Sequence, residues 1–208
     1  MVYVSENNND TDISIKISFL GYSGSGKTSI IEKYLYGEFN YNVQATIGCI
    51  FQYKNINHNE HKILITINDT AGQEKFNSIP RMYYRGVNAF VIVYDITDER
   101  SFENIKYWLE DIHTHSNENN NIFIVGNKND IQKNLRVHDE LALKKILDDQ
   151  YFDIFKNKNY SYMEVSAKTG INIHKLINLV VNKSINENKF EVYTKKKTFL
   201  NDSVNNCC

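Results

Sequence analysis

Two adjoining stretches decide the fold: ISIKISFL at residues 13–20 and GYSGSGKT at residues 21–28. The first predicts a strand. The second matches the phosphate-binding pattern G-x-x-x-x-G-K-[ST] and runs into a predicted helix over residues 27–36. Glycines let such a loop curl until its N–H groups point at a phosphate, and the helix N-terminus adds positive potential. We expect Lys27 to reach the β- and γ-phosphates and the Thr28 hydroxyl to bind Mg²⁺. The alternative is a glycine-rich turn without a ligand.

A second motif, D-T-A-G-Q at residues 69–73, follows an apolar strand. A carboxylate at a strand end, opposite a phosphate loop, suits Mg²⁺, and this assigns Asp69 to the metal. Gly72 can offer an unobstructed N–H to a γ-phosphate. Gln73 has both a donor and an acceptor, which the orienting of an attacking water requires. An ordinary polar turn is the alternative for this motif.

Two later motifs also follow predicted strands, and the first of them predicts selection of the base. N-K-N-D at residues 127–130 follows the apolar run 122–125, and S-A-K at residues 166–168 follows a predicted strand over 160–165. Asp130 can accept hydrogen bonds from guanine N1–H and the exocyclic amine, a pair of donors that adenine lacks. In an asparagine-rich chain, N-K-N-D alone is a weak signal and could be a simple turn. All four motifs, however, lie at the carboxyl ends of predicted strands, and open α/β sheets bind their ligands at that edge.

The remaining pattern predicts an α/β three-layer domain with a mostly parallel sheet, because strands and helices alternate along the chain. Further strands are expected at 50–56 and 62–67, as a hairpin, and at 87–94 and 122–125. Helices are expected at 101–113, with Ser101 as N-cap, and at 139–147 and 173–185. The first of these would bury one apolar face, made of Phe102, Ile105, Trp108, Leu109 and Ile112.

Bulk properties exclude several classes of protein. The 208 residues carry a net charge of -1, so nothing in the charge favours nucleic acid as a partner. No apolar run reaches the roughly 18 residues of a membrane span, and we expect no signal peptide in the polar first residues. The cysteines Cys49, Cys207 and Cys208 cannot build a disulfide framework. We expect a flexible arm at 1–12, one domain at 13–185 and a flexible tail at 186–208.

The four motifs together resemble those of the Ras superfamily. Y-Y-R-G at 83–86, V-Y-D-I-T at 93–97, Q-E-K-F at 73–76 and the final Cys-Cys are more specific to its Rab family. The resemblance covers about residues 13–185 and the last two residues. It implies the P-loop NTPase fold, with a six-stranded, mostly parallel sheet and helices on both faces. It also implies GTP and GDP as bound nucleotides, Mg²⁺ as cofactor and slow hydrolysis of GTP.

The resemblance also assigns roles to individual residues. Thr46, in A-T-I-G, would complete Mg²⁺ binding in the GTP state, and Phe39 would pack on the guanine. Lys128 would lay its stem on the base, and the Ala167 N–H would bond guanine O6. The expected catalytic residues are Gln73, Lys27 and Thr46, and the expected metal ligands are Thr28, Thr46 and Asp69. The expected nucleotide-binding residues are Ser23, Gly24, Ser25, Gly26, Lys27, Thr28, Ser29, Phe39, Thr46, Gly72, Asn127, Lys128, Asp130, Ser166, Ala167 and Lys168.

The sequence departs from the Rab pattern in four places. Asn68 stands where Trp usually precedes D-T-A-G, so the aromatic cluster that effectors read would lack one ring. Cys49–Ile50 replaces the commoner Val-Asp, and Tyr22 replaces an acidic or small residue. Residues 151–159 form an apparent insertion. The branch is open, because P-R-M-Y-Y-R-G favours an endocytic Rab and Q-A-T-I-G a Golgi-related one.

The tail and the partners follow from the same resemblance. The final Cys207–Cys208 resembles the doubly geranylgeranylated Rabs, and two lipid chains give stable anchoring. Lys195–Lys197 could add attraction to anionic lipid. We expect a monomer on the cytoplasmic face of endosomal or Golgi-related membranes, cycling with the cytosol. Its expected partners are an activating protein, an exchange factor, a GDP-dissociation inhibitor or escort protein, and effectors.

Two other functions remain as alternatives. One is a nucleotide-loaded interaction module with negligible turnover, against which Gln73, Thr46 and Lys27 argue. The other is a P-loop kinase or ATPase, against which the guanine-selecting motif at 127–130 argues.

Overall fold

The computed structural model describes residues 12–59, 61–72, 84–116, 120–137 and 160–186, together with the backbone of 191–192. The strands are β1 (Ile13–Leu20), β2 (Cys49–His58), β3 (His61–Thr70), β4 (Ala89–Asp95), β5 (Asn121–Asn127), β6 (Tyr160–Glu164) and β7 (Glu191–Val192). The helices are α1 (Lys27–Tyr36), α2 (Glu99–His115) and α4 (Ile173–Asn186), with a single 3-10 turn at Lys133–Leu135. The predicted helix at 139–147 and the apparent insertion at 151–159 lie outside the described residues.

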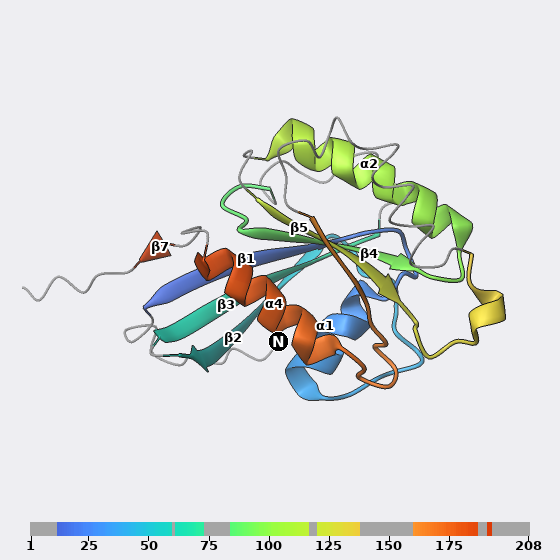
Figure 1. Ribbon diagram of the computed structural model, residues 1–208, viewed down its shortest axis with the longest axis horizontal. Coiled ribbons are helices and arrows are strands. Elements are labelled where there is room, and N and C mark those ends of the chain that lie inside the picture. The colour runs from blue at the N-terminus through green and yellow to red at the C-terminus, as the bar shows by residue number, and fades with distance from the viewer. Residues whose placement is uncertain are drawn as a thin grey trace, which may run out of the picture.

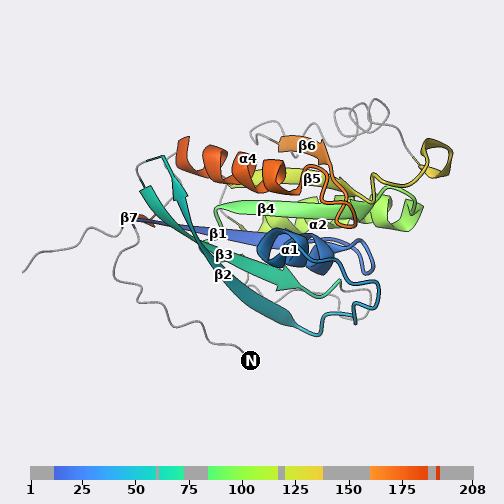
Figure 2. The same ribbon diagram turned by 90° about the horizontal axis from the view of Figure 1, so that it is seen from below.

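Six of the described strands lie side by side in one sheet in the order β2-β3-β1-β4-β5-β6, and the short β7 pairs with β1 off this path. Every neighbouring pair along this path is parallel except the β2–β3 hairpin. This confirms the predicted α/β fold and its six-stranded, mostly parallel sheet. Helices α1 and α4 cover one face and α2 covers the other, as the two views show (Figure 1, Figure 2). The carboxyl ends of β1, β3, β4, β5 and β6 therefore share one edge, where the four motifs begin.

Each face of the sheet has its own apolar core. On one face, isoleucines of β1 and β3 such as Ile15 and Ile65 pack with Ile30 of α1 and Val180 of α4. On the other face, Phe90 and other residues of β4 and β5 pack against α2. The predicted apolar face of that helix is confirmed, since Phe102, Ile105, Trp108, Leu109 and Ile112 are all buried. The site thus rests on a rigid two-sided core.

The start of α2 differs from the prediction. Ser101 is not the N-cap, because the helix begins at Glu99 and the Asp98 carboxylate accepts a hydrogen bond from the Arg100 N–H at 3.1 Å. Ser101 has another role, since its hydroxyl oxygen accepts a bond from the Asp95 N–H at 2.9 Å. Both Asp98 and Ser101 are residue types that cap helices, so the sequence alone allowed either as the N-cap. In the structure Asp98 caps the helix, and the hydrogen bond from the Asp95 N–H holds Ser101 inside the first turn.

Strand β7 lies within the range expected as a flexible tail. Its two residues pair antiparallel with Ile13 and Ser14 of β1, and α4 ends just before it at Asn186. None of the described helices is long and apolar enough to cross a membrane.

Candidate nucleotide-binding site

The phosphate loop joins β1 to α1 and requires glycine at two of its corners. Gly21 has φ +139°, and a Cβ there would lie 2.1 Å from the Val93 carbonyl oxygen. Gly26 has φ +92°, and a Cβ there would lie 2.2 Å from Asn127 Nδ2. These backbone angles and close approaches exclude a side chain. The loop is therefore wedged between β4 and the N-K-N-D motif, as a tight phosphate cradle requires.

Lys27 closes this loop from inside. Its ammonium donates to the carbonyl oxygens of Gly21 at 2.9 Å and Tyr22 at 3.0 Å, although the residue is only 5% exposed. The N-cap of α1 is Gly26, so no side chain caps the first N–H groups of the helix. Ser29 is half-buried in that first turn, and Gly24 turns the loop at φ +74°. Donors and one cation thus converge where a phosphate is expected.

Three oxygen-bearing side chains from distant segments meet beside the loop. The Thr28 hydroxyl lies 2.8 Å from Asp69 Oδ2 and 2.8 Å from the Thr46 hydroxyl. Asp69 Oδ1 is buried and has no hydrogen-bond partner in the described part of the chain. Two hydroxyls and a carboxylate with a spare oxygen are the hard oxygen donors that Mg²⁺ prefers. The predicted set Thr28, Thr46 and Asp69 therefore fits a magnesium ion.

Burial also acts on the charge of Asp69. The loss of water raises the pKa of this carboxyl to about 6, against the opposing effects of the Thr28 hydrogen bond and the Lys27 charge. A buried carboxylate that is this costly to ionise favours a cation beside it.

The D-T-A-G segment lies against the phosphate loop. A Cβ on Gly72 would lie 2.4 Å from the backbone nitrogen of Ser23 and 2.5 Å from its Cα. Only glycine permits this approach, which brings the Gly72 backbone to the phosphate end of the site. Gln73, the predicted water-orienting residue, lies outside the described residues, as do Cys207 and Cys208.

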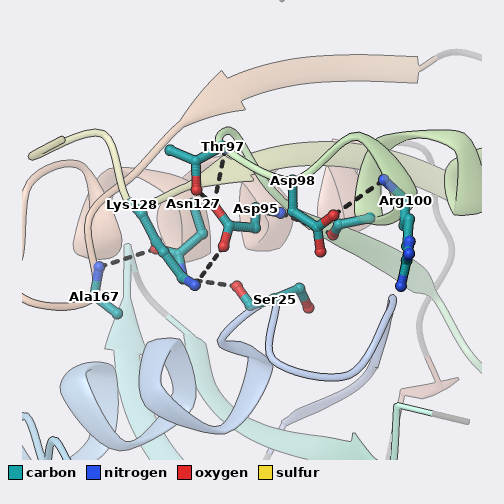
Figure 3. A network of polar contacts seen from close by, with 9 residues as sticks. Ser25, Asp95, Thr97, Asp98, Arg100, Asn127, Lys128 and Ala167 are labelled. Atoms are coloured by element: carbon teal, nitrogen blue, oxygen red, sulfur yellow. Dashed lines mark hydrogen bonds and ion pairs between the residues drawn. The ribbon is translucent and has the colours of Figure 1, made fainter. Parts of the chain in front are cut away.

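Asn127 ties the phosphate loop to both base-selecting motifs. It is 2% exposed. Its Nδ2 donates to the Ser25 carbonyl at 2.9 Å, and its Oδ1 accepts from the Ala167 N–H at 3.1 Å. One amide thus spans three loops (Figure 3). The Ala167 N–H is the donor predicted for guanine O6, so that bond would require it to be shared.

The Asp130 carboxylate, which the sequence predicts to select the base, is exposed. The Ser166 hydroxyl donates to Asp130 Oδ1 at 2.6 Å and holds the carboxylate against the S-A-K loop. Phe39 packs against the core near α1, and its ring meets the Tyr41 ring edge-on at 5.0 Å. The Lys168 ammonium lies 5.6 Å from the centre of the Tyr41 ring. These contacts bring the segment after α1 beside the S-A-K loop.

Sequence reasoning missed three residues that support the base-selecting motifs. Arg136 donates to both Glu164 oxygens at 2.9 Å, and it also bonds Asn129 inside N-K-N-D. Asp95 forms an ion pair with Lys128. Tyr41 bridges to Lys168. Asp95 lies in the quoted motif V-Y-D-I-T at a strand end, which was a usable signal. No motif marked Arg136 or Tyr41, whose contacts with Glu164 and Lys168 join residues far apart in the chain.

Two departures from the Rab pattern have structural counterparts. Asn68 is fully buried on β3, and neither polar atom of its side chain has a hydrogen-bond partner among the described residues. Its register neighbour on β1, Ser18, is also buried with an unpartnered hydroxyl. Cys49 is half-buried at the start of β2, and burial raises the pKa of its thiol to about 11.

Comparison with known proteins agrees with this geometry. The Ras family model matches residues 16–186. Ras-related protein SEC4 of Saccharomyces cerevisiae is 32% identical over 215 residues, which cover 98% of this chain and 95% of that protein. Ras-related protein SEC4 of Candida albicans (strain WO-1) is 34% identical over 181 residues, covering 85% of this chain and 82% of that protein. Ras-related protein Rab-10 of Diplobatis ommata is 38% identical over 164 residues, covering 79% and 78%.

The family model and these relatives each span most of the chain. The residues that the family model matches, 16–186, include all four motifs of the site. The protein therefore belongs to the Ras family of small GTPases, in its Rab group, and is a guanine-nucleotide-binding GTP hydrolase.

Proposed function

We propose that this GTPase is a magnesium-dependent switch that hydrolyses GTP slowly and cycles between GTP and GDP forms on intracellular membranes. The observation that carries the proposal is the Asn127 amide, which joins the phosphate loop to both base-selecting loops. A phosphate cradle and a base-selecting carboxylate held by one framework suit a whole nucleotide.

Each group of residues has a distinct task in this proposal. Lys27 and the loop amides bind the β- and γ-phosphate oxygens, and Asp130 selects guanine. Thr28, Thr46 and Asp69 hold Mg²⁺, which supplies charge neutralisation for the phosphates when bound. Gln73 orients the attacking water. Gly72 offers its backbone N–H to the γ-phosphate, so the segment that follows it senses which nucleotide is present.

The slow rate follows from a missing charge. Neither the phosphate loop at 21–28 nor the segment 38–48 contains arginine. Phosphoryl transfer is accelerated on the order of 10³–10⁵-fold by an arginine that stabilises the transferring group. We infer that an activating protein supplies this charge, and that an exchange factor promotes release of GDP.

Membrane attachment and effector binding complete the cycle. The expected domain at 13–185 would carry the switch, and the tail at 186–208 would anchor it through prenylated Cys207 and Cys208, with a GDP-dissociation inhibitor or escort protein covering the lipids. Effectors would read the exposed apolar side chains Ile47, Phe51 and Tyr53 on and before the edge strand β2. This arrangement fits vesicle trafficking at the cytoplasmic face of endosomal or Golgi-related membranes.

Exchange of the base-selecting carboxylate tests the nucleotide assignment. Asp130→Asn keeps an oxygen for the Ser166 hydroxyl but replaces an acceptor by an amide donor. Guanine, which presents N1–H and an amine, would lose its match, whereas xanthine, with a carbonyl at that edge, would gain one. We expect the affinity for GDP to fall by about 100-fold or more and the affinity for xanthosine diphosphate (XDP) to rise, because the guanine N1–H and amine would meet an amide donor in place of their acceptor. Unchanged GDP affinity in this variant would contradict the assignment of Asp130.

A further inference from the structure

A second carboxylate stands beside the base-selecting loop, and none of the roles above uses it. Asp95 is the last residue of β4 and is 8% exposed. Its Oδ2 forms an ion pair with the Lys128 ammonium. Its Oδ1 accepts from the Thr97 N–H at 2.9 Å and from the Thr97 hydroxyl at 2.8 Å. Figure 3 shows the carboxylate between Thr97 and Lys128.

The surrounding backbone fixes the direction of this carboxylate. Asp95 pairs in register with Asn127 on β5, and the Ile96 N–H donates to the Asn127 carbonyl at 3.2 Å. The Asp95 N–H is itself held by the Ser101 hydroxyl. With Oδ1 occupied by Thr97, Oδ2 is left facing Lys128. A nearly buried carboxylate needs such a partner, because its desolvation is otherwise uncompensated.

Lys128 is constrained at both ends by this arrangement. Its backbone adopts φ +72°, a left-handed conformation that is uncommon outside glycine. Its side chain is 37% exposed, so a four-carbon stem of this kind would otherwise sample many rotamers. The ion pair orders the stem before a ligand arrives, and the ammonium still has donors to spare, since it carries three.

We propose that Asp95 is a positioning residue for the nucleotide: it holds Lys128 so that the lysine stem lies ready against the face of the purine, and so slows nucleotide release. This inference rests on the proposed guanine-nucleotide site. The gain is one of pre-organisation, because a side chain that is already ordered loses less entropy on binding.

The test is the rate of release of a fluorescent GDP analogue from Mg²⁺-bound full-length protein. Asp95→Asn keeps an acceptor for Thr97 but removes the charge that faces Lys128. We expect release to be about fivefold faster, as for a partly exposed charge-assisted contact. Asp98→Asn is the matched control: Asp98 lies on the same turn and caps α2 through Arg100, and an amide can still cap. Its release rate should equal that of the wild type.

A double-mutant cycle separates positioning from a structural role. Lys128→Met keeps an unbranched stem but no charge. If Asp95 acts through Lys128, then Asp95→Asn should add nothing to the release rate of Lys128→Met. Inosine diphosphate (IDP) has the purine ring of GDP but lacks the exocyclic amine. Because the Lys128 stem would contact the face of the ring and not that amine, Asp95→Asn should speed the release of an IDP analogue by the same factor as that of GDP.

Either of two results would overturn the proposal. One is a release rate of Asp95→Asn equal to that of Asp98→Asn. The other is a double variant of Asp95→Asn and Lys128→Met whose acceleration of release is the product of the two single accelerations. Both leave the nucleotide site itself intact. A wild-type protein that retained no GDP would instead refute the proposed function, so the two failures are distinguishable.

Discussion

Removal of the Asn127 amide should loosen the site and the fold together. In Asn127→Ala the Ser25 carbonyl loses its donor at 2.9 Å and the Ala167 N–H loses its acceptor at 3.1 Å. Both partner residues are buried, Ser25 at 0% and Ala167 at 3% exposed. An orphaned buried group costs about 1–3 kcal/mol, so two of them cost about 2–6 kcal/mol. Water that enters the phosphate loop would hydrogen-bond to part of these orphaned groups, so we expect the free energy of unfolding to fall by about 3 kcal/mol.

Thermal and urea unfolding of the GDP-bound protein measure this loss. About 3 kcal/mol corresponds to a drop in Tm of roughly 6–12 °C for a chain of this size. Asn127→Asp should cost at least as much, because it keeps an acceptor for Ala167 but sets a carboxylate oxygen against the Ser25 carbonyl oxygen. Asn55→Ala, on an exposed position of β2, is the control and should change stability by less than about 0.5 kcal/mol.

The reasoning would be refuted by an Asn127→Ala protein that unfolds within about 1 kcal/mol of the wild type. Such a result would mean that the three loops hold their places without the amide.

Three further outcomes follow from the same structure. Removal of divalent cations with EDTA should speed GDP release from the wild type but much less from Asp69→Asn, because the variant lacks the carboxylate proposed to bind the ion. Equal acceleration in both proteins would exclude Asp69 as a ligand. Burial favours the neutral form of the Cys49 thiol, so it should react with iodoacetamide at pH 8 about 100-fold more slowly than an ordinary thiol, and the rate should rise up to about pH 11. Rapid alkylation of Cys49 at pH 8, measured by peptide mass spectrometry, would contradict this. Asn68→Leu should raise the free energy of unfolding by about 1–3 kcal/mol, because it replaces a buried amide that has no partners among the described residues. Asn55→Leu, at an exposed position, should not raise it. A lower free energy of unfolding for Asn68→Leu, measured in urea, would show that the amide is hydrogen-bonded in solution.

Local signals predicted the centre of the fold best. Strand β1 and helix α1 have the predicted bounds, because an apolar run and a glycine turn mark both limits. The hairpin strands extend beyond the predicted ranges, to Cys49–His58 and His61–Thr70, because their pairing continues through residues outside the apolar runs at both ends, from Cys49 opposite Thr70 to His58 opposite His61. Strand β7 carried no apolar pattern that would have marked it.

The motifs predicted which side chains of the proposed magnesium site lie close together. Thr28, Thr46 and Asp69 meet as the motifs predicted, although they come from three segments. The supporting contacts were not predicted, since the pairing of Asp95 with Lys128 and of Arg136 with Glu164 depends on strand register. The effect of Asn68 was also hidden: the sequence predicted a missing aromatic ring, and the structure shows a buried amide without partners.

Calorimetric titration of nucleotide-stripped protein would test most directly whether these loops form one magnesium-assisted guanine site. The account predicts tight one-to-one uptake of GDP and GTP in the presence of Mg²⁺, weaker uptake in EDTA and none of ADP. Folded protein that took up no guanine nucleotide, or that bound ADP equally well, would contradict it.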